Sequence, residues 1–205
     1  MDSNECIRPP GTYYDIIAHP VDRKRAIEVA IVQDHRFAFF YWLKWRNKQA
    51  DQPNPPALIS LDWHQDLVPP CDLECEWLSA LDADDYKAVG YFCWDKLHVL
   101  NDGHILAAAY LNLIGDIHVV QKQRDECPED FVDVDGRKHL VCCYDSVEQL
   151  TEAVSGLKYD SAILDIDLDY FTESPDLCGG GDQLQLVGQD EIQACLDPTS
   201  PFMSW

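Results

Sequence analysis

The sequence predicts an α/β protein, a three-layer α/β/α arrangement around a mostly parallel sheet, in a single domain spanning residues 1–205. Segments with the pattern of strands alternate with segments with the pattern of helices, which is the order expected when helices connect parallel strands. The strand segments are apolar almost throughout, as in strands that are covered on both faces. A length of 205 residues suits one domain with a full hydrophobic core.

The first elements are a strand, a helix and a second strand. Residues 26–32, "AIEVAIV", form an apolar run with one glutamate and predict a buried parallel strand. In residues 36–49, "RFAFFYWLKWRNKQ", aromatic side chains recur at helical spacing and predict a helix that faces the core. "DQPNPP" at 51–56 ends this helix, and "ALISLD" at 57–62 predicts the next strand.

The middle of the chain gives a less complete pattern. Residues 71–85 are rich in acidic side chains, and their pattern predicts neither a helix nor a strand. Residues 105–114, "ILAAAYLNLI", predict a helix that Gly115 caps. "DIHVVQ" at 116–121 predicts the strand that follows.

Another strand, helix and strand complete the pattern. We expect a strand within "KHLVCCY" at 138–144 and a helix in "DSVEQLTEAVSG" at 145–156, with an Asp or Ser cap and a closing Gly. "SAILDID" at 161–167 predicts the last strand, and "CGGGD" at 178–182 predicts a flexible loop.

Charge and composition exclude some classes of partner. The formal net charge is −22, which argues against nucleic acid or an anionic membrane and leaves cationic ligands and metal ions open. The N-terminal residues lack the apolar region of a signal peptide, and no stretch approaches the ~20 apolar residues of a membrane span, so we expect a cytoplasmic protein. The nine cysteines are then mostly free thiols. The pairs Cys71/Cys75 and Cys142/Cys143 lack zinc-finger spacing and are interpreted as ordinary thiols.

Three predicted strands end in polar clusters. "QDH" ends at His35, "DWHQD" carries Asp62, His64 and Asp66 at alternate positions, and "DIDLD" begins with Asp165 and Asp167. Ligand sites of open α/β sheets lie outside the carboxyl ends of the strands, so we expect these side chains to converge there. Four clustered carboxylates raise one another's pKa values, and two divalent cations would balance their charge.

Oxygen-rich ligands with some imidazole suit manganese, and a pair of such ions is a known hydrolytic device. The simpler alternative is that a chain with 37 acidic residues produces alternating aspartates by composition, with Asp62 capping a turn. Three alternating acids at the end of an apolar strand favour a cation site over that alternative.

These motifs resemble those of the arginase and agmatinase (ureohydrolase) superfamily. "DWHQD" is similar to its D-x-H-x-D motif, "LDIDLD" to its S-x-D-x-D motif, and "QDH" before a helix to its G-G-D-H element. Within the superfamily the chain resembles most the small peptide arginase branch of the landornamide type. The resemblance implies an arginase–deacetylase fold and two Mn²⁺ ions.

The resemblance also implies a role for each metal ligand. Asp62 and Asp165 bridge the two ions, His35 and Asp66 complete one coordination shell, and His64 and Asp167 complete the other. Asp169 has no counterpart in the family's motifs. The zinc deacetylases of the superfamily lack counterparts of His35, Asp66 and Asp167, so the presence of all three favours two metals.

The resemblance implies a peptide arginase, which hydrolyses arginine side chains of a ribosomally made precursor peptide to ornithine and urea. His104 is the expected catalytic proton donor, with His98 as the alternative. A guanidinium needs a carboxylate partner, and Asp197 and Glu173 are the candidates.

The remaining histidines have a structural interpretation. His118 lies inside a predicted strand and is expected to be packed, whereas His19 and His139 are expected to be structural or exposed.

Several other functions stay open. The same fold supports deacetylation of a lysine or polyamine, and ureohydrolysis of free arginine or agmatine. The chain is shorter than an arginase that acts on free arginine, which favours a peptide substrate. A third class is a non-catalytic protein whose metals are structural or absent.

Overall fold

The centre of the protein is a four-stranded parallel sheet. The computed structural model describes residues 6–98 and 100–171. The sheet has the order β7-β4-β3-β8, and every pair in it is parallel. Its strands are β3 (Ala57–Asp62), β4 (Ile117–Gln121), β7 (Val141–Tyr144) and β8 (Ala162–Ile166). The predicted mixed α/β class with a parallel sheet is confirmed.

The order of the strands creates a reversal beside β3. From β3 the chain adds β4 and then β7 on one side, and it then returns to the other side of β3 as β8. The direction of winding therefore changes between β3 and β8. In open parallel sheets, the carboxyl ends of the strands at such a reversal form the usual ligand crevice.

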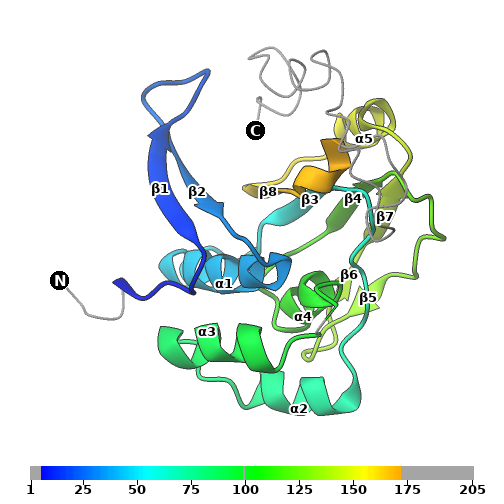
Figure 1. Cartoon of the computed structure of the whole chain (residues 1–205). Coiled ribbons are helices and arrows are strands. Elements are labelled where there is room, and N and C mark those ends of the chain that lie inside the picture. The colour runs from blue at the N-terminus through cyan, green and yellow to red at the C-terminus, as the bar shows by residue number, and fades with distance from the viewer. Residues whose placement is uncertain (1–5, 99, 172–205) are drawn as a thin grey trace, which may run out of the picture.

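Helices lie on both faces of the sheet, an arrangement compatible with three layers (Figure 1). The larger group packs its aromatic and aliphatic side chains, such as Phe39, Leu43 and Ile105, against Leu58 and Ile117 of the sheet. The five helices of the described residues are α1 (Ala38–Lys48), α2 (Asp72–Ser79), α3 (Tyr86–Asp95), α4 (His104–Tyr110) and α5 (Val147–Val154).

Helix α5 covers the opposite face. Its Leu150 and Val154 pack with Ile59, Leu61 and Val120 of the sheet. Ser146 caps this helix, because its hydroxyl accepts a hydrogen bond from the Gln149 N–H. The serine alternative for this cap is thus the one that the structure has.

The prediction of a buried parallel strand at 26–32 is wrong. The segment is β2 (Ala26–Ile31), which pairs antiparallel with β1 (Tyr13–Ala18) in a hairpin outside the central sheet. Most of its side chains are exposed. A short polar turn precedes β2, and an antiparallel partner can be reached across such a turn, whereas a parallel partner needs a long crossover.

The other elements follow the prediction with local differences. Segment 138–144 is divided into β6 (Lys138–His139), which pairs antiparallel with β5 (Phe131–Val132), and β7. Helix α4 ends at Tyr110, so Gly115 is not its cap. Instead, the Gly115 N–H donates to the carbonyl of Pro56 at 2.7 Å, where a side chain would crowd the backbone of Pro55. Residues 71–85 contain α2, which the sequence did not assign.

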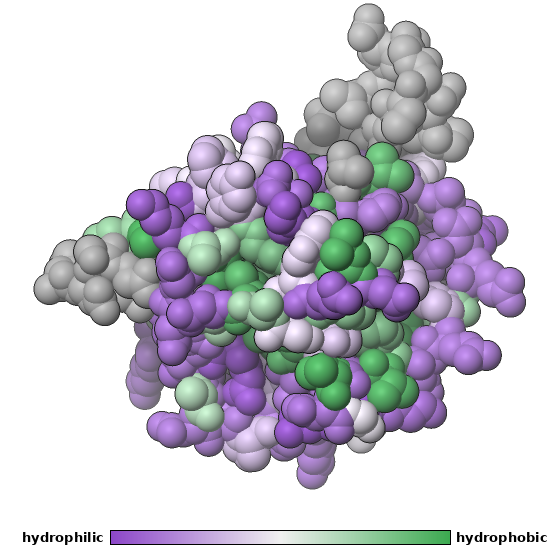
Figure 2. All heavy atoms as spheres, turned by 90° about the horizontal axis from the view of Figure 1, so that it is seen from below, coloured by the Kyte–Doolittle hydropathy of each residue, from purple (hydrophilic) through white to green (hydrophobic). Residues whose placement is uncertain are grey.

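The surface over α2 and α3 is mixed in polarity. Figure 2 views this face and shows scattered hydrophobic side chains within a largely hydrophilic surround. Among the helices of the described residues, none has the length and hydropathy that a membrane span requires.

Candidate metal centre

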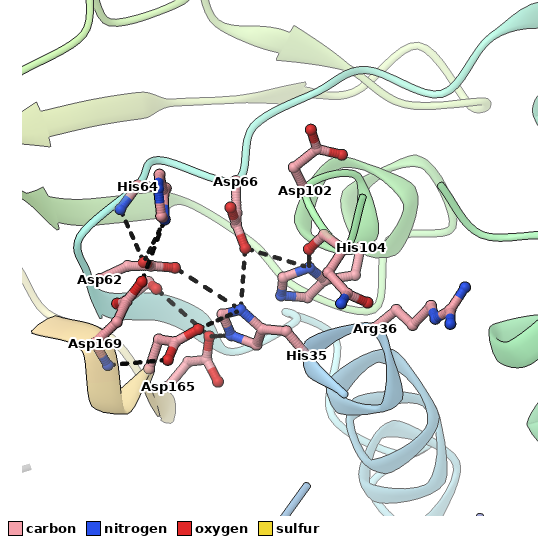
Figure 3. Close-up of polar contacts among 12 residues, drawn as sticks. His35, Arg36, Asp62, His64, Asp66, Asp102, His104, Asp165 and Asp169 are labelled. Atoms are coloured by element: carbon pink, nitrogen blue, oxygen red, sulfur yellow. Dashed lines mark hydrogen bonds and ion pairs between the residues drawn. The ribbon is translucent and has the colours of Figure 1, made fainter. Parts of the chain in front are cut away.

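The three polar segments converge at the carboxyl edge of the sheet, beside the reversal. Nε2 of His35 lies 2.9 Å from Oδ2 of Asp165, and Nδ1 of the same ring lies 3.0 Å from Oδ2 of Asp66 and 3.3 Å from Oδ2 of Asp167. Figure 3 shows His35 at the centre of this set of carboxylates. The predicted convergence of distant segments is confirmed.

The residues that follow strand β3 reach the site through a tight turn at the end of the strand. Asp62 is the last residue of the strand and is 1% exposed. Its Oδ1 accepts a hydrogen bond from the His64 N–H at 2.9 Å, which bends the chain directly after the strand. Asp66 follows with φ of 50°, a left-handed conformation that aspartate tolerates better than most residues.

Strand β8 and the residues after it place their carboxylates beside those that follow β3. Asp165 lies within the strand and accepts a hydrogen bond from the buried Ser60 hydroxyl at 3.4 Å. The Asp167 N–H donates to the carbonyl of Leu61 at 2.9 Å, which extends the contact with β3 by one step beyond β8. A short 3-10 helix, η3 (Leu168–Phe171), follows and places Asp169 near His64.

The His35 ring comes from the turn before α1. It begins the 3-10 helix η2 (His35–Phe37), which leads directly into α1. Its ring lies 4.2 Å, centroid to centroid, from the ring of His104 at the start of α4. The His104 ring also lies against Trp42 of α1 and is fully buried.

His104 keeps one unpaired ring nitrogen. Its Nδ1 lies 3.1 Å from the carbonyl of Asn101, so Nδ1–H is the donor of that hydrogen bond. Its Nε2 is buried and has no hydrogen-bond partner. The ring thus presents a lone pair at Nε2 beside the cluster.

Burial and crowding shift the pKa values of the cluster. Burial, and then the charge of Asp66, raise the pKa of Asp62 to about 9. Burial opposes a positive His35, but the charges and hydrogen bonds of Asp165 and Asp66 outweigh it and raise the pKa of His35 to about 12. In return, His35 outweighs the effect of burial on Asp165 and lowers the pKa of that carboxyl. Burial lowers the pKa of His104 to about 3, so this ring is neutral at neutral pH.

Three overlapping groups of side chains could hold a metal ion. Within each group, one ligand atom per residue lies within 4.8 Å of the others. The groups are His35/His104/Asp165, His35/Asp62/Asp167 and Asp62/His64/Asp169.

The residues present fit a divalent cation. Oδ2 of Asp62 is buried without a hydrogen-bond partner, although burial of such an oxygen is costly. One protonated imidazole carries a single positive charge among several carboxylates, so the cluster can accept further positive charge. Carboxylates with imidazoles suit manganese or zinc better than a soft thiolate metal.

The six predicted metal ligands lie together, but two further residues join them. Asp169 and His104 belong to groups that could hold an ion, and neither is in the ligand set that the resemblance implies. For Asp169 the sequence signal is the third aspartate of the alternation at 165, 167 and 169. His104 is distant in sequence and only the packing of α4 against α1 brings it to His35.

The other predicted residues lie apart from this centre or outside the described residues. His98 pairs with Asp102. His118 is packed within the sheet, as predicted, between the hydroxyls of Tyr144 and Tyr159. His19 and His139 are both buried and hydrogen-bonded. Glu173 and Asp197, the predicted guanidinium-binding residues, lie outside the described residues.

The cysteines of the described residues are free. None of them belongs to a group there that could hold a metal. The interpretation of Cys71, Cys75, Cys142 and Cys143 as ordinary thiols agrees with this.

The fold and the centre define an α/β protein with a histidine–aspartate cluster at the reversal of its sheet. No protein-family model matches the chain, and no curated protein matches it. The argument for a function therefore starts from the cluster itself.

Proposed function

We propose that the protein is a binuclear manganese hydrolase that converts arginine side chains of a peptide to ornithine with release of urea. The single observation that carries the proposal is the meeting of His35, Asp62 and Asp165 at the reversal of the sheet. Structural cations have no need of that position, whereas substrates of open α/β proteins bind there.

The proposed ligands are the six residues that the two motifs and His35 supply. Asp62 and Asp165 would serve both ions, His35 and Asp66 would serve one, and His64 and Asp167 would serve the other. A pair of such cations acidifies water, which makes a nucleophile available near neutral pH.

The side chains of the cluster differ in exposure, which gives the substrate a direction of approach. The His64 side chain is 47% exposed and that of Asp167 is 35% exposed, whereas Asp62 and His104 are buried. A guanidinium would therefore arrive from the side of His64 and Asp167. Its positive charge is attracted by the carboxylates and by the net charge of −22.

His104 is the proposed proton carrier. Because Nδ1 is held by the carbonyl of Asn101, Nε2 is the atom that takes up the proton that the attacking water loses. The same atom then protonates the leaving amine and the carbon–nitrogen bond breaks. The hydroxyl proton of the intermediate passes to the released amine, so the guanidinium's single positive charge is kept and the products are urea and a protonated ornithine side chain.

The test is a substrate comparison with the manganese-loaded protein. We expect urea, together with the mass change of an arginine-to-ornithine conversion, from an arginine-containing peptide and less from free arginine or agmatine. Acetate from an acetyl-lysine peptide or an acetylated polyamine, without urea, would replace the proposal with a deacetylase. No product from any substrate by a manganese-loaded protein would indicate a structural metal.

Variants separate the roles within the site. Asp165→Asn should lose both manganese and activity, whereas His104→Asn should lose activity and keep manganese. Loss of manganese from His104→Asn would make His104 a ligand. Glu152→Gln, which removes one exposed acid of α5, is the control for the change in charge.

A further inference from the structure

We infer that Asp169 is a ligand of the more exposed cation, which it holds together with Asp62 and His64. This inference rests on the metal-binding part of the proposed function. It adds a residue that the motifs of the sequence do not assign to the metal.

The carboxylate of Asp169 is oriented by the backbone. Its Oδ1 accepts a hydrogen bond from the Trp63 N–H at 3.1 Å, which ties η3 to the turn after β3. Its Oδ2 then lies 3.3 Å from Nδ1 of His64. The next residue, Tyr170, is 4% exposed and packs with Ile59 and Leu61, so it anchors the short helix that carries Asp169.

The separation of the two ligand atoms matches coordination of one ion. Two atoms that are each about 2.1 Å from a shared cation lie about 3–3.5 Å apart for tetrahedral or octahedral geometry. Oδ2 of Asp169 and Nδ1 of His64 satisfy this at 3.3 Å. Oδ1 of Asp62 lies 3.8 Å from the same Nδ1 and needs only a small adjustment.

A second observation points to a cation independently of the acidic cluster. Asp62 is 1% exposed, and its Oδ2 has no hydrogen-bond partner. Nδ1 of His35 lies 3.8 Å from this oxygen, beyond hydrogen-bond distance, and a cation bound by Asp62 would lower the cost of burying the carboxylate. Figure 3 shows Asp62 between His64 and Asp169 on one side and His35 on the other.

The three groups that could hold a metal overlap in a way that places Asp169 at a different ion from His35 and Asp165. The group Asp62/His64/Asp169 shares no residue with the group His35/His104/Asp165, so both can be filled at the same time. The middle group, His35/Asp62/Asp167, shares one residue with each. An ion held by Asp62, His64 and Asp169 on the side that faces solvent therefore leaves His35 and Asp165 available for the second ion, and His104 need not be one of its ligands.

The decisive variant is Asp169→Asn. Asparagine keeps Oδ1 as the acceptor for the Trp63 N–H, and it replaces Oδ2 by an amide nitrogen that cannot bind a cation. Manganese binding is measured by calorimetric titration and by the Mn²⁺ electron paramagnetic resonance spectrum. We expect two binding events in the unaltered protein, of which Asp169→Asn weakens one at least tenfold and leaves the other within about twofold.

Glu152→Gln is the matched control for loss of one negative charge and should bind as the unaltered protein does. Equal binding by Asp169→Asn and the unaltered protein would overturn the inference and leave Asp169 as a turn residue. If the unaltered protein binds no manganese, the proposed function fails as well, so the two failures are distinguishable.

A gain-of-function variant covers the case in which Asp169→Asn does not fold. Asp169→Cys places a thiolate at the same position, and thiolates favour softer metals. We expect a new thiolate-to-cadmium absorption band upon addition of Cd²⁺, relative to the unaltered protein and to Glu152→Cys. Its absence from folded Asp169→Cys would count against the inference.

Discussion

Nε2 of His35 lies 2.9 Å from Oδ2 of Asp165, although 130 positions of the chain separate the two residues. The contact joins the turn before α1 to the strand β8, and both flank the end of β3. Because His35 also contacts Asp66 and Asp167, one imidazole links both acidic segments. The cluster is therefore a property of the tertiary fold.

The metal-free protein should lose stability as the pH rises from about 6.5 to about 9. The pKa of His35 is raised from 6.5 to about 12, and that of Asp62 from 3.8 to about 9. Over this interval the folded protein binds more protons than the unfolded chain, so the free energy of unfolding falls with pH. Each group contributes a slope of up to about 1.4 kcal/mol per pH unit. Urea denaturation in a chelator, at several pH values, measures this slope.

Manganese should reverse this dependence, because ligands bind a metal in their deprotonated forms. At a free concentration of 100 times the dissociation constant, one bound ion adds about 2.7 kcal/mol to the free energy of unfolding. Asp62→Asn should flatten the metal-free profile. A stability that rises with pH in the chelator would contradict the assignment of protons to His35 and Asp62.

His118→Phe should destabilise the protein by about 1–3 kcal/mol and leave manganese binding unchanged. Nδ1 of His118 is hydrogen-bonded to the Tyr144 hydroxyl at 3.0 Å, and its Nε2 to the Tyr159 hydroxyl at 2.8 Å. Phenylalanine leaves both hydroxyls without this partner. Urea denaturation and a manganese titration measure the two effects. Weaker manganese binding by this variant would contradict the expectation that His118 has no effect on the metal centre.

Gly103→Ala should destabilise the protein by about 1–3 kcal/mol through overpacking. A Cβ atom at Gly103 would lie 2.9 Å from Cβ of His98, in the segment that leads to His104. Gly156→Ala is the matched control, since a Cβ there meets nothing within 4 Å. Thermal denaturation compares the two variants, and equal melting temperatures would contradict the close contact.

Asp85→Ala should cost about 1 kcal/mol through loss of the cap of α3. The Asp85 carboxylate accepts hydrogen bonds from the N–H groups of Lys87 and Ala88. Asp85→Asn removes the same charge and keeps an acceptor, so it should retain most of the stability. If both variants lose the same amount in urea denaturation, charge and not capping stabilises this helix end.

The central sheet could be predicted because the apolar composition of its strands indicates that they are buried. Strand β3, "ALISLD", is buried at every position, and its apolar run alone indicates a covered strand. Strand β2 has a similar apolar run but lies in an exposed hairpin. The short turn that joins β1 to β2 determines its pairing partner, and the hydropathy of the strand does not.

The candidate site was predictable in part for the same reason. Residues two apart at a strand end face the same space, which is how Asp62, Asp66, Asp165 and Asp167 could be grouped. The position of Asp169 depends instead on the 3-10 helix after β8 and on the Trp63 N–H. No local pattern in the sequence encodes that contact.

The reversal of the sheet has a consequence for biosynthesis. His35 and the segment from Asp62 to Asp66 leave the ribosome early, but the strand that completes the cluster is made only when residue 165 has been added. Nascent fragments that end before it carry four of the six proposed ligand residues and lack Asp165 and Asp167. If the cluster binds metal as proposed, binding by the full set of ligands requires the last strand to have docked, and a shortened translation product would leave Asp62 and Asp66 without that strand.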